Sequence, residues 1–177
     1  LDFPGVGTLE SFNTDGLRTL LKTIDVPNMK EKTLRYPGHA ERMRMLRETG
    51  FFDKAPMDVG GAPVAPLDVT SQLLFSQWRL PEGEEDLTVM RVILEGEKDG
   101  RPARRRFDLF DRYDKETRTT SMARTTGYTC TAGVRALAAG LYRTPGITPP
   151  EFLGRDEGCF DFMMEKLVER GVVFRAS

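Results

Sequence analysis

The stretch LTVMRVIL at residues 87–94 is dense in valine, isoleucine and leucine, which favour an extended backbone. A second run, at residues 104–113, places Phe107, Leu109 and Tyr113 on one side and charged residues mostly on the other. Between the two runs stands KDGR at residues 98–101, and its Asp-Gly pair supplies the positive φ angles of a tight turn. The sequence therefore predicts an antiparallel β-hairpin here.

Helical patterns follow the hairpin. A long helix is predicted from Ser121 to about Leu141, and a shorter one over residues 160–170 ends before Gly171. Residues 145–150 form a predicted loop between them. Small residues on one stripe of the long helix should allow close approach to a sheet or a ligand. That stripe comprises Ala123, Gly127, Cys130, Val134, Leu137 and Leu141.

Before the hairpin, the order strand, corner, helix occurs twice. Strands are predicted over residues 6–12 and 29–36, and helices over residues 17–24 and 39–49. Residues 51–65 are rich in Gly, Pro and Asp, which favours a loop. A further helix is predicted over residues 67–78, with Asp68 as a candidate N-cap.

Length and charge limit the function classes. The 177 residues suffice for one sizeable core, so a single α/β domain over residues 1–177 is expected. Basic and acidic residues number 26 and 27, and the formal charge of −1 argues against nucleic acid or an anionic membrane as a partner. Neither a signal peptide nor an apolar run near the ~20 residues of a membrane span is present, so we expect a cytoplasmic protein. The start at Leu1 favours a domain excised from a longer chain.

The two cysteines, Cys130 and Cys159, lie in different segments. No CxxC motif or histidine cluster accompanies them, so neither a metal site nor a disulfide is predicted. Both thiols are expected to be free and buried.

The glycines of Gly5-Val6-Gly7 invite comparison with the dinucleotide fingerprint GxGxxG. The third glycine position holds Glu10, and the glycines precede the predicted strand rather than follow it. A complete Rossmann domain is therefore not expected in this chain.

Two polar corners are candidate sites. Asn13, Thr14 and Asp15 follow the first predicted strand, where they could cap the next helix, bind a polar substrate, or do both. The second corner, TLRYPGH at residues 33–39, brings an arginine, a tyrosine and the only histidine within five residues. Arg35 could bind a carboxylate, and Tyr36 or His39 could carry a proton. The alternatives are a surface ion pair, a half-buried aromatic ring and a helix-start residue.

The third candidate is the helix start TTSMARTTGY at residues 119–128. A cation near a helix N-terminus is mildly disfavoured unless a negative group lies opposite it, so Arg124 implies an anionic partner. That partner is either a ligand or an acidic side chain such as Asp15. Thr125, Thr126 and Gly127 add hydroxyls and a gap that a flat ring or a carboxamide could occupy. The alternative is a Ser-capped amphipathic helix with an ordinary exposed arginine.

In order along the chain, these motifs resemble the C-terminal domain of the saccharopine dehydrogenase and lysine 6-dehydrogenase family. The matching segments span nearly the whole chain, and the pair T-(L/M)-R-Y-x-G and S-M-A-x-T-x-G-(Y/F) is fairly specific at this separation. They are residues 10–21, TLRYPG at 33–38, DLFD at 108–111, SMARTTGY at 121–128 and ERGV at 169–172.

The resemblance implies an α+β fold, with a mixed, largely antiparallel sheet and helices packed on one face. It also implies an oxidoreductase that transfers hydride between a C–N bond of an amino acid and NAD or NADP. The cofactor would be held mainly by an N-terminal Rossmann domain absent from this chain, which alone should be inactive. This domain would supply the substrate pocket and the contact of a homodimer. A non-catalytic dimerisation or ligand-sensing module is the alternative.

Carried over by position, the resemblance gives each site residue a role. Substrate contacts are expected at Asn13, Thr14, Asp15, Thr33, Arg35, Tyr36 and Gly38, with Arg124 as a second possible carboxylate clamp. Tyr36 or His39 would handle the proton, and Met122, Thr125, Thr126 and Gly127 would face the cofactor.

One departure bears on the substrate. Saccharopine-cleaving members carry an arginine where this chain has Thr14, which disfavours saccharopine itself. The YPGH sequence at residues 36–39 is closer to the lysine-dehydrogenase-like branch, which favours a smaller amino acid or a polyamine-like amine.

Overall fold

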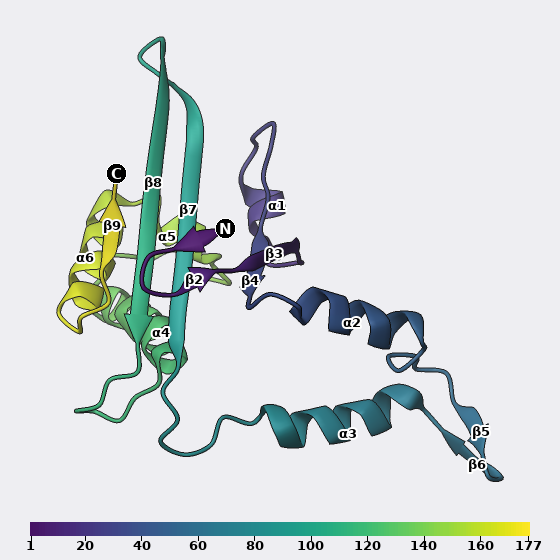
Figure 1. The fold of residues 1–177 in the computed structure, drawn as a ribbon. Helices are drawn as coiled ribbons and strands as arrows, with labels where there is room; N and C mark the ends of the chain where they lie inside the picture. The colour runs from purple at the N-terminus through teal and green to yellow at the C-terminus, as the bar shows by residue number, and fades with distance from the viewer. The chain divides into compact units, whose positions relative to one another are not determined.

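The computed structural model describes all residues from 1 to 177, and the chain divides into two compact units, residues 1–82 and 83–177. Figure 1 shows their elements, and each unit is described by itself. The predicted α+β class is confirmed, with helices and small sheets in both units. Every strand pair is antiparallel, so the sheet expected to be mixed contains no parallel pair.

The predicted hairpin is the framework of the second unit. Strands β7 (Leu87–Lys98) and β8 (Arg101–Arg112) pair antiparallel from Leu87 opposite Arg112 to Lys98 opposite Arg101. Asp99 and Gly100 have φ angles of 54° and 74°, as the Asp-Gly turn predicted. Because the turn is tight, pairing continues to the tip, and both strands are longer than expected. The short β9 (Phe174–Ala176) completes the order β7-β8-β9.

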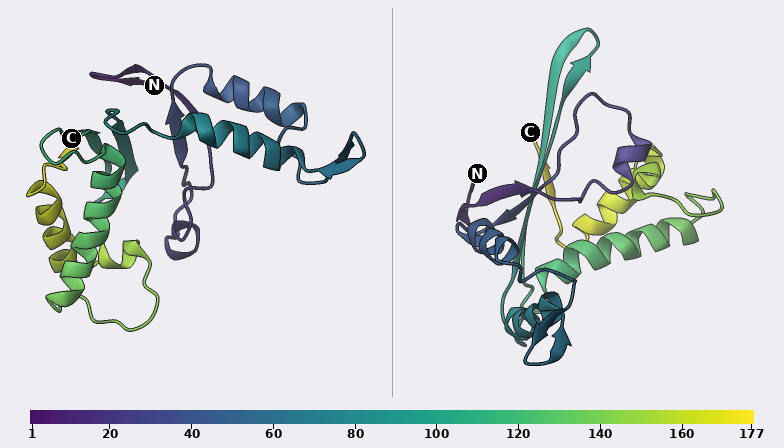
Figure 2. Two further views of the ribbon diagram at one scale, coloured as in Figure 1. Left: turned by 90° about the horizontal axis from the view of Figure 1, so that it is seen from below. Right: turned by 90° about the vertical axis from the view of Figure 1, so that its right-hand side faces the viewer.

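Two helices cover one face of this sheet. Helices α4 (Ser121–Ala138) and α6 (Glu157–Val168) pack side by side, as Figures 1 and 2 show, with the short α5 (Pro150–Leu153) between them in sequence. The core joins Leu109 of β8 to Leu167 of α6 and to Val172. Tyr128, Met164 and Phe174 pack around it.

The buried face of α4 differs from the predicted stripe. Val134 and Leu137 of that stripe are exposed, whereas Ala132 and Ala136 are buried. The reason is the partner helix: small residues allow α6 to approach, and a Cβ at Gly133 would lie 3.9 Å from the terminal methyl carbon of Met163. Small residues do allow the close approach, but they lie on a different face of α4 from the predicted stripe.

The first unit is built from short antiparallel pairs. Strand β1 (Asp2–Phe3) pairs with β2 (Gly7–Thr8), and β3 (Glu10–Asn13) pairs with β4 (Lys32–Arg35). The strand predicted over residues 6–12 is therefore two strands, separated at the buried Leu9. The helix predicted over residues 17–24 is only α1 (Leu20–Thr23), because Arg18 has a φ of 48°, which lies outside the right-handed helical region.

The rest of the first unit follows the prediction more closely. Helix α2 (His39–Glu48) matches, and α3 (Pro66–Trp78) begins one residue early because proline at its first position presets the helical φ. Asp68 lies in the first turn of α3 and is not its N-cap. The segment predicted as a loop contains the hairpin β5 (Met57–Val59) and β6 (Ala62–Val64), closed by two glycines with positive φ angles, Gly60 and Gly61.

None of the helices combines the length and the apolar character that crossing a membrane requires.

Candidate functional site

The Arg35–His39 corner links β4 to α2, and a carboxylate from β3 holds it. The backbone N–H groups of Gly38 and Ala40 donate to the two oxygens of Glu10, at 3.1 and 2.6 Å. The N-cap position of α2 is Gly38, which has no side chain to cap the helix and adopts a φ of 95°. These hydrogen bonds, above all the one from Ala40, lower the pKa of Glu10, so the group is ionised at neutral pH.

The three predicted functional side chains of this corner have different environments. Arg35 is exposed, donates from Nη1 to the carbonyl oxygen of Leu34 at 2.7 Å, and has no carboxylate within ion-pair distance. Tyr36 is 61% exposed. His39 is half-buried, and its ring stacks on Phe12 of β3 with centroids 5.9 Å apart and an interplanar angle of 9°. The corner therefore presents one unpaired cation and one open phenol, beside an imidazole fixed by an aromatic ring.

The Asn13–Asp15 corner is engaged with Glu31. Thr14 donates its hydroxyl to Glu31 and lies 2.9 Å from the hydroxyl of Thr33, while Gly16 donates its N–H to Glu31 at 3.2 Å. The Thr14 hydroxyl is the main cause that lowers the pKa of Glu31.

The other two residues of that corner differ from each other. Asn13 is exposed, and Asp15 forms a surface ion pair with Arg18 at 3.2 Å. The predicted substrate residues Thr14 and Thr33 thus share hydrogen bonds with a carboxylate that the sequence reading did not single out.

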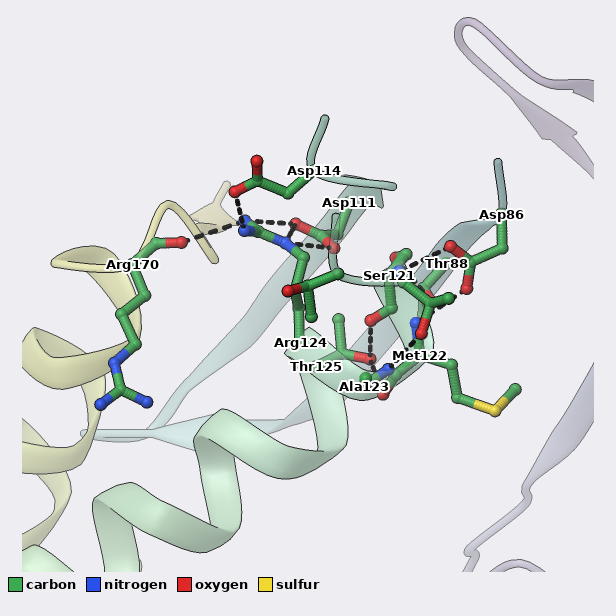
Figure 3. A network of polar contacts seen from close by, with 12 residues as sticks. Asp86, Thr88, Asp111, Asp114, Ser121, Met122, Ala123, Arg124, Thr125 and Arg170 are labelled. Carbon is green, nitrogen blue, oxygen red and sulfur yellow. Dashed lines mark hydrogen bonds and ion pairs between the residues drawn. The ribbon is translucent and has the colours of Figure 1, made fainter. Parts of the chain in front are cut away.

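The start of α4, in the second unit, is also capped by an acid. Asp86, which precedes β7, accepts from the N–H groups of Ser121 at 2.6 Å and Met122 at 2.9 Å. The Thr120 side chain accepts from the N–H of Ala123 at 3.2 Å, and the buried Ser121 hydroxyl pairs with that of Thr88 at 2.9 Å. The N-cap is therefore Thr120 rather than Ser121, and chain atoms satisfy the first N–H groups of the helix (Figure 3).

Arg124 lies inside the second unit and is 7% exposed. Its Nε donates to both oxygens of Asp111 at 3.2–3.3 Å, and its Nη1 to Asp114 at 2.8 Å. Its Nη2 donates to Asp111 at 3.2 Å and to the carbonyl oxygen of Arg170 at 3.0 Å (Figure 3). Hydrogen bonds to Asp111 are the largest cause that raises the Arg124 pKa.

The anionic partner predicted for Arg124 is thus found within the chain. It is neither Asp15 nor a ligand, and the arginine is buried rather than exposed. With all three guanidinium nitrogens engaged, Arg124 joins β8, the following loop and the end of α6. We therefore assign Arg124 a structural role rather than a contact with a substrate carboxylate.

The four predicted cofactor residues lie on the first two turns of α4. Met122 is 69% exposed, Thr126 is exposed, and a Cβ at Gly127 would meet no atom within 4 Å. The hydroxyls of Thr125 and Thr126 donate to helix carbonyl oxygens, of Ser121 at 2.9 Å and of Met122 at 2.5 Å. This surface of the helix is largely exposed. It does not offer free N–H groups to a phosphate, because Asp86 already occupies them.

The remaining glycine and cysteine predictions can be placed. Gly5 and Gly7 lie in the short β1–β2 hairpin and open no helix, so they offer no phosphate-binding turn. Cys159 is free and buried, and burial raises its pKa, whereas Cys130 is free but exposed, against the prediction of two buried thiols. Cys130 lies on the side of α4 turned away from the core. Histidine, cysteine and acidic side chains form no group of three or more that could hold a metal ion.

A comparison with protein families confirms the family resemblance seen in the sequence. The model of the saccharopine dehydrogenase C-terminal domain matches residues 1–172 of the 177. The chain belongs to this family. The match extends over residues of both compact units and includes the Arg35–His39 corner and the start of α4.

Sequence reasoning missed the acids that organise these segments: Glu10, Glu31, Asp86, Asp111 and Asp114. One signal was available, because the N-cap positions of α2 and α4 hold Gly38 and Thr120 rather than an acidic residue. Which helix each acid would reach depends on strand pairing, which the sequence did not specify for residues 10–35.

Proposed function

We propose that this chain is the substrate-binding part of an oxidoreductase that acts on a C–N bond of an amino acid. It would work with a nicotinamide cofactor bound mainly by a separate Rossmann domain. The family match over residues 1–172 is the observation that carries the proposal. The unpaired Arg35 supports it, because an exposed guanidinium without a carboxylate partner is suited to bind the carboxylate of a substrate.

The residues of the corner divide the work. Arg35 binds and orients the substrate carboxylate. Tyr36 or His39 accepts the proton of the substrate ammonium, because hydride leaves most easily from the carbon beside a neutral amine. The bound cofactor supplies the hydride acceptor. By the resemblance, Met122, Thr125, Thr126 and Gly127 of α4 would face the cofactor.

Lysine-type substrates are favoured over saccharopine. Thr14 stands where the resemblance places an arginine in saccharopine-cleaving members, and it donates its hydroxyl to Glu31. Glu31 is ionised at neutral pH, and the hydrogen bond from Thr14 lowers its pKa further, so this carboxylate adds negative charge to the corner. Negative charge attracts a substrate amine and repels the additional carboxylates of saccharopine.

The test is a kinetic comparison in the protein that joins this domain to its Rossmann domain. Arg35→Ala should raise the KM for lysine about 10- to 100-fold, since a hydrogen bond to a charged group contributes ~1.5–3 kcal/mol. Arg44→Ala is the matched control, because Arg44 is an exposed arginine of α2 with no ion pair. An unchanged kcat/KM in Arg35→Ala would remove Arg35 from the clamp role. Absence of nicotinamide reduction with lysine, saccharopine and carboxyalkyl-polyamines would favour the alternative of a non-catalytic module.

The resemblance further supports a homodimer in which this domain supplies the contact. Sedimentation equilibrium of the joined protein checks it, and a monomer at micromolar concentration would contradict it.

A further inference from the structure

Glu10 stands directly opposite Arg35 in the β3–β4 pair, yet its carboxylate does not bind that arginine. Side chains of directly opposed residues lie on the same face of a sheet, within reach of each other. The carboxylate binds instead to the N–H groups of Gly38 and Ala40 at the start of α2. The helix end and Arg35 thus compete for one carboxylate, and in the structure the helix end holds it.

A second contact joins the same strand to the same helix. Phe12 lies two residues after Glu10 on β3, so both side chains point to one face. The Phe12 ring stacks on His39, the first residue of α2. One polar and one aromatic contact from β3 therefore fix the beginning of α2.

The corner has little else to fix it. Gly38 contributes no side-chain cap and adopts a φ of 95°, a conformation that restrains few neighbours because glycine has no Cβ. The hydrogen bond from the N–H of His39 to the carbonyl oxygen of Tyr36 is long, at 3.4 Å. Tyr36 itself is 61% exposed.

We propose that Glu10 is a positioning residue of the substrate corner: by binding the start of α2 it sets the place of His39 and leaves Arg35 unpaired. This inference rests on the proposed function for its kinetic part. Glu10 touches neither substrate nor cofactor in this role. Because its negative charge fills the positive end of α2, a substrate carboxylate is directed to Arg35 rather than to the helix end.

The variant that tests the role is Glu10→Ala, with Glu10→Gln as a conservative replacement of the same length. The matched control is Glu41→Gln, since Glu41 lies in the first turn of the same helix and makes no contact with the Gly38 or Ala40 N–H groups. A positional shift near 1 Å can cost about 100-fold in rate, so a partial displacement in Glu10→Ala should lower kcat/KM for lysine about tenfold. Glu10→Gln should recover part of that loss, and Glu41→Gln should stay within about twofold of the parent.

A spectroscopic measurement separates positioning from activity. His39 is the only histidine of the 177-residue chain, so a ¹H–¹³C correlation spectrum of this folded chain contains a single imidazole signal set. Glu10→Ala should move these signals as the ring shifts on Phe12, and Glu41→Gln should not. Unmoved His39 signals in folded Glu10→Ala, or an equal displacement in Glu41→Gln, would overturn the positioning role. This readout requires no catalysis, so it decides the role of Glu10 even where the assays show no dehydrogenase activity.

Discussion

Arg35 and Arg124 are the two arginines of the predicted site, and they lie in opposite environments. Arg35 is exposed on the first unit and has no carboxylate partner. Arg124 is buried in the second unit between Asp111 and Asp114 and also donates to the carbonyl oxygen of Arg170. A buried guanidinium must have its charge compensated inside the protein, whereas an exposed one can keep its donors for a ligand. The contrast makes Arg35 the functional candidate and Arg124 the structural one.

The two helix starts, in contrast, are alike. Each receives a carboxylate from the beginning of a strand: Glu10 at the start of α2 and Asp86 at the start of α4. In both, the electrostatic argument that a helix end attracts an anion is correct, but the anion belongs to the chain. An in-chain acid is therefore the first partner to consider for such a segment before a ligand is invoked.

Removing Arg124 should have the largest effect on stability. Arg124→Met leaves the buried Asp111 and the half-buried Asp114 without their cation, which should lower the free energy of unfolding by about 3–5 kcal/mol. Urea unfolding followed by circular dichroism measures it. A loss under about 1 kcal/mol would mean that the network contributes little and that Arg124 could be released to a ligand. Arg101→Met, at the exposed hairpin end, is the control and should change stability by less than about 0.5 kcal/mol.

Removing the acid that caps α4 should have an intermediate effect. Asp86→Ala deprives two backbone N–H groups of their acceptor, and loss of an N-terminal cap costs about 0.5–2 kcal/mol. Its neighbour Glu85 makes only an exposed ion pair with Lys115, so Glu85→Ala should cost at most about 1 kcal/mol. Thermal unfolding of the two variants side by side tests the difference. Equal losses would show that the contacts of Asp86 at the start of α4 add nothing beyond surface charge.

The sequence predicted the elements whose signals are local. The hairpin followed from its Asp-Gly turn, and α2, α3 and α6 followed from helical spacing between clear breaks. It did not predict the β5–β6 hairpin, because a Gly-Gly turn flanked by only three residues on each side resembles a loop. The buried face of α4 was also wrong, since it depends on where α6 packs rather than on the α4 sequence alone.

The candidate site was predictable in part for the same reason. The corner from Arg35 to His39 and the start of α4 were found from residue type and spacing. The partners of those residues lie 28 to 35 positions away, as for Glu10 with Gly38 and for Asp86 with Ser121. Such contacts depend on tertiary pairing. The partners of Arg124, Asp111 and Asp114, lie only 13 and 10 positions before it. An anion could be inferred from Arg124, but which acid supplies it depends on how α4 packs on β8.

Acid should weaken both units slightly, by way of different carboxylates. The pKa of Glu10 is lowered from 4.5, mainly by the Ala40 N–H, and that of Asp114 from 3.8, mainly by the Thr117 N–H. A folded-state pKa below the unfolded one contributes stability above the unfolded pKa, and this is lost as pH falls through the folded pKa. Thermal midpoints should therefore decline below pH 4.5 for the Glu10 contribution and below 3.8 for that of Asp114.

Variants separate the two contributions to acid sensitivity. Glu10→Gln should reduce the part that begins at the higher pH, to which Glu31 also contributes, and Asp114→Asn should reduce the lower part, to which Asp108 also contributes. Midpoints that fall in parallel for both variants and the parent would show that other carboxylates dominate.

Arg35→Ala should have the smallest effect on stability, and it gives the clearest contrast between the two arginines. The side chain is exposed and its only hydrogen bond goes to the neighbouring carbonyl oxygen of Leu34, so the free energy of unfolding should change by less than about 0.5 kcal/mol. The same substitution should raise the KM strongly, whereas Arg124→Met should lower stability first. A residue that contributes to binding but not to folding is what a substrate clamp requires. A stability loss in Arg35→Ala near that of Arg124→Met would place both arginines in the framework and leave the substrate carboxylate without a partner on this domain.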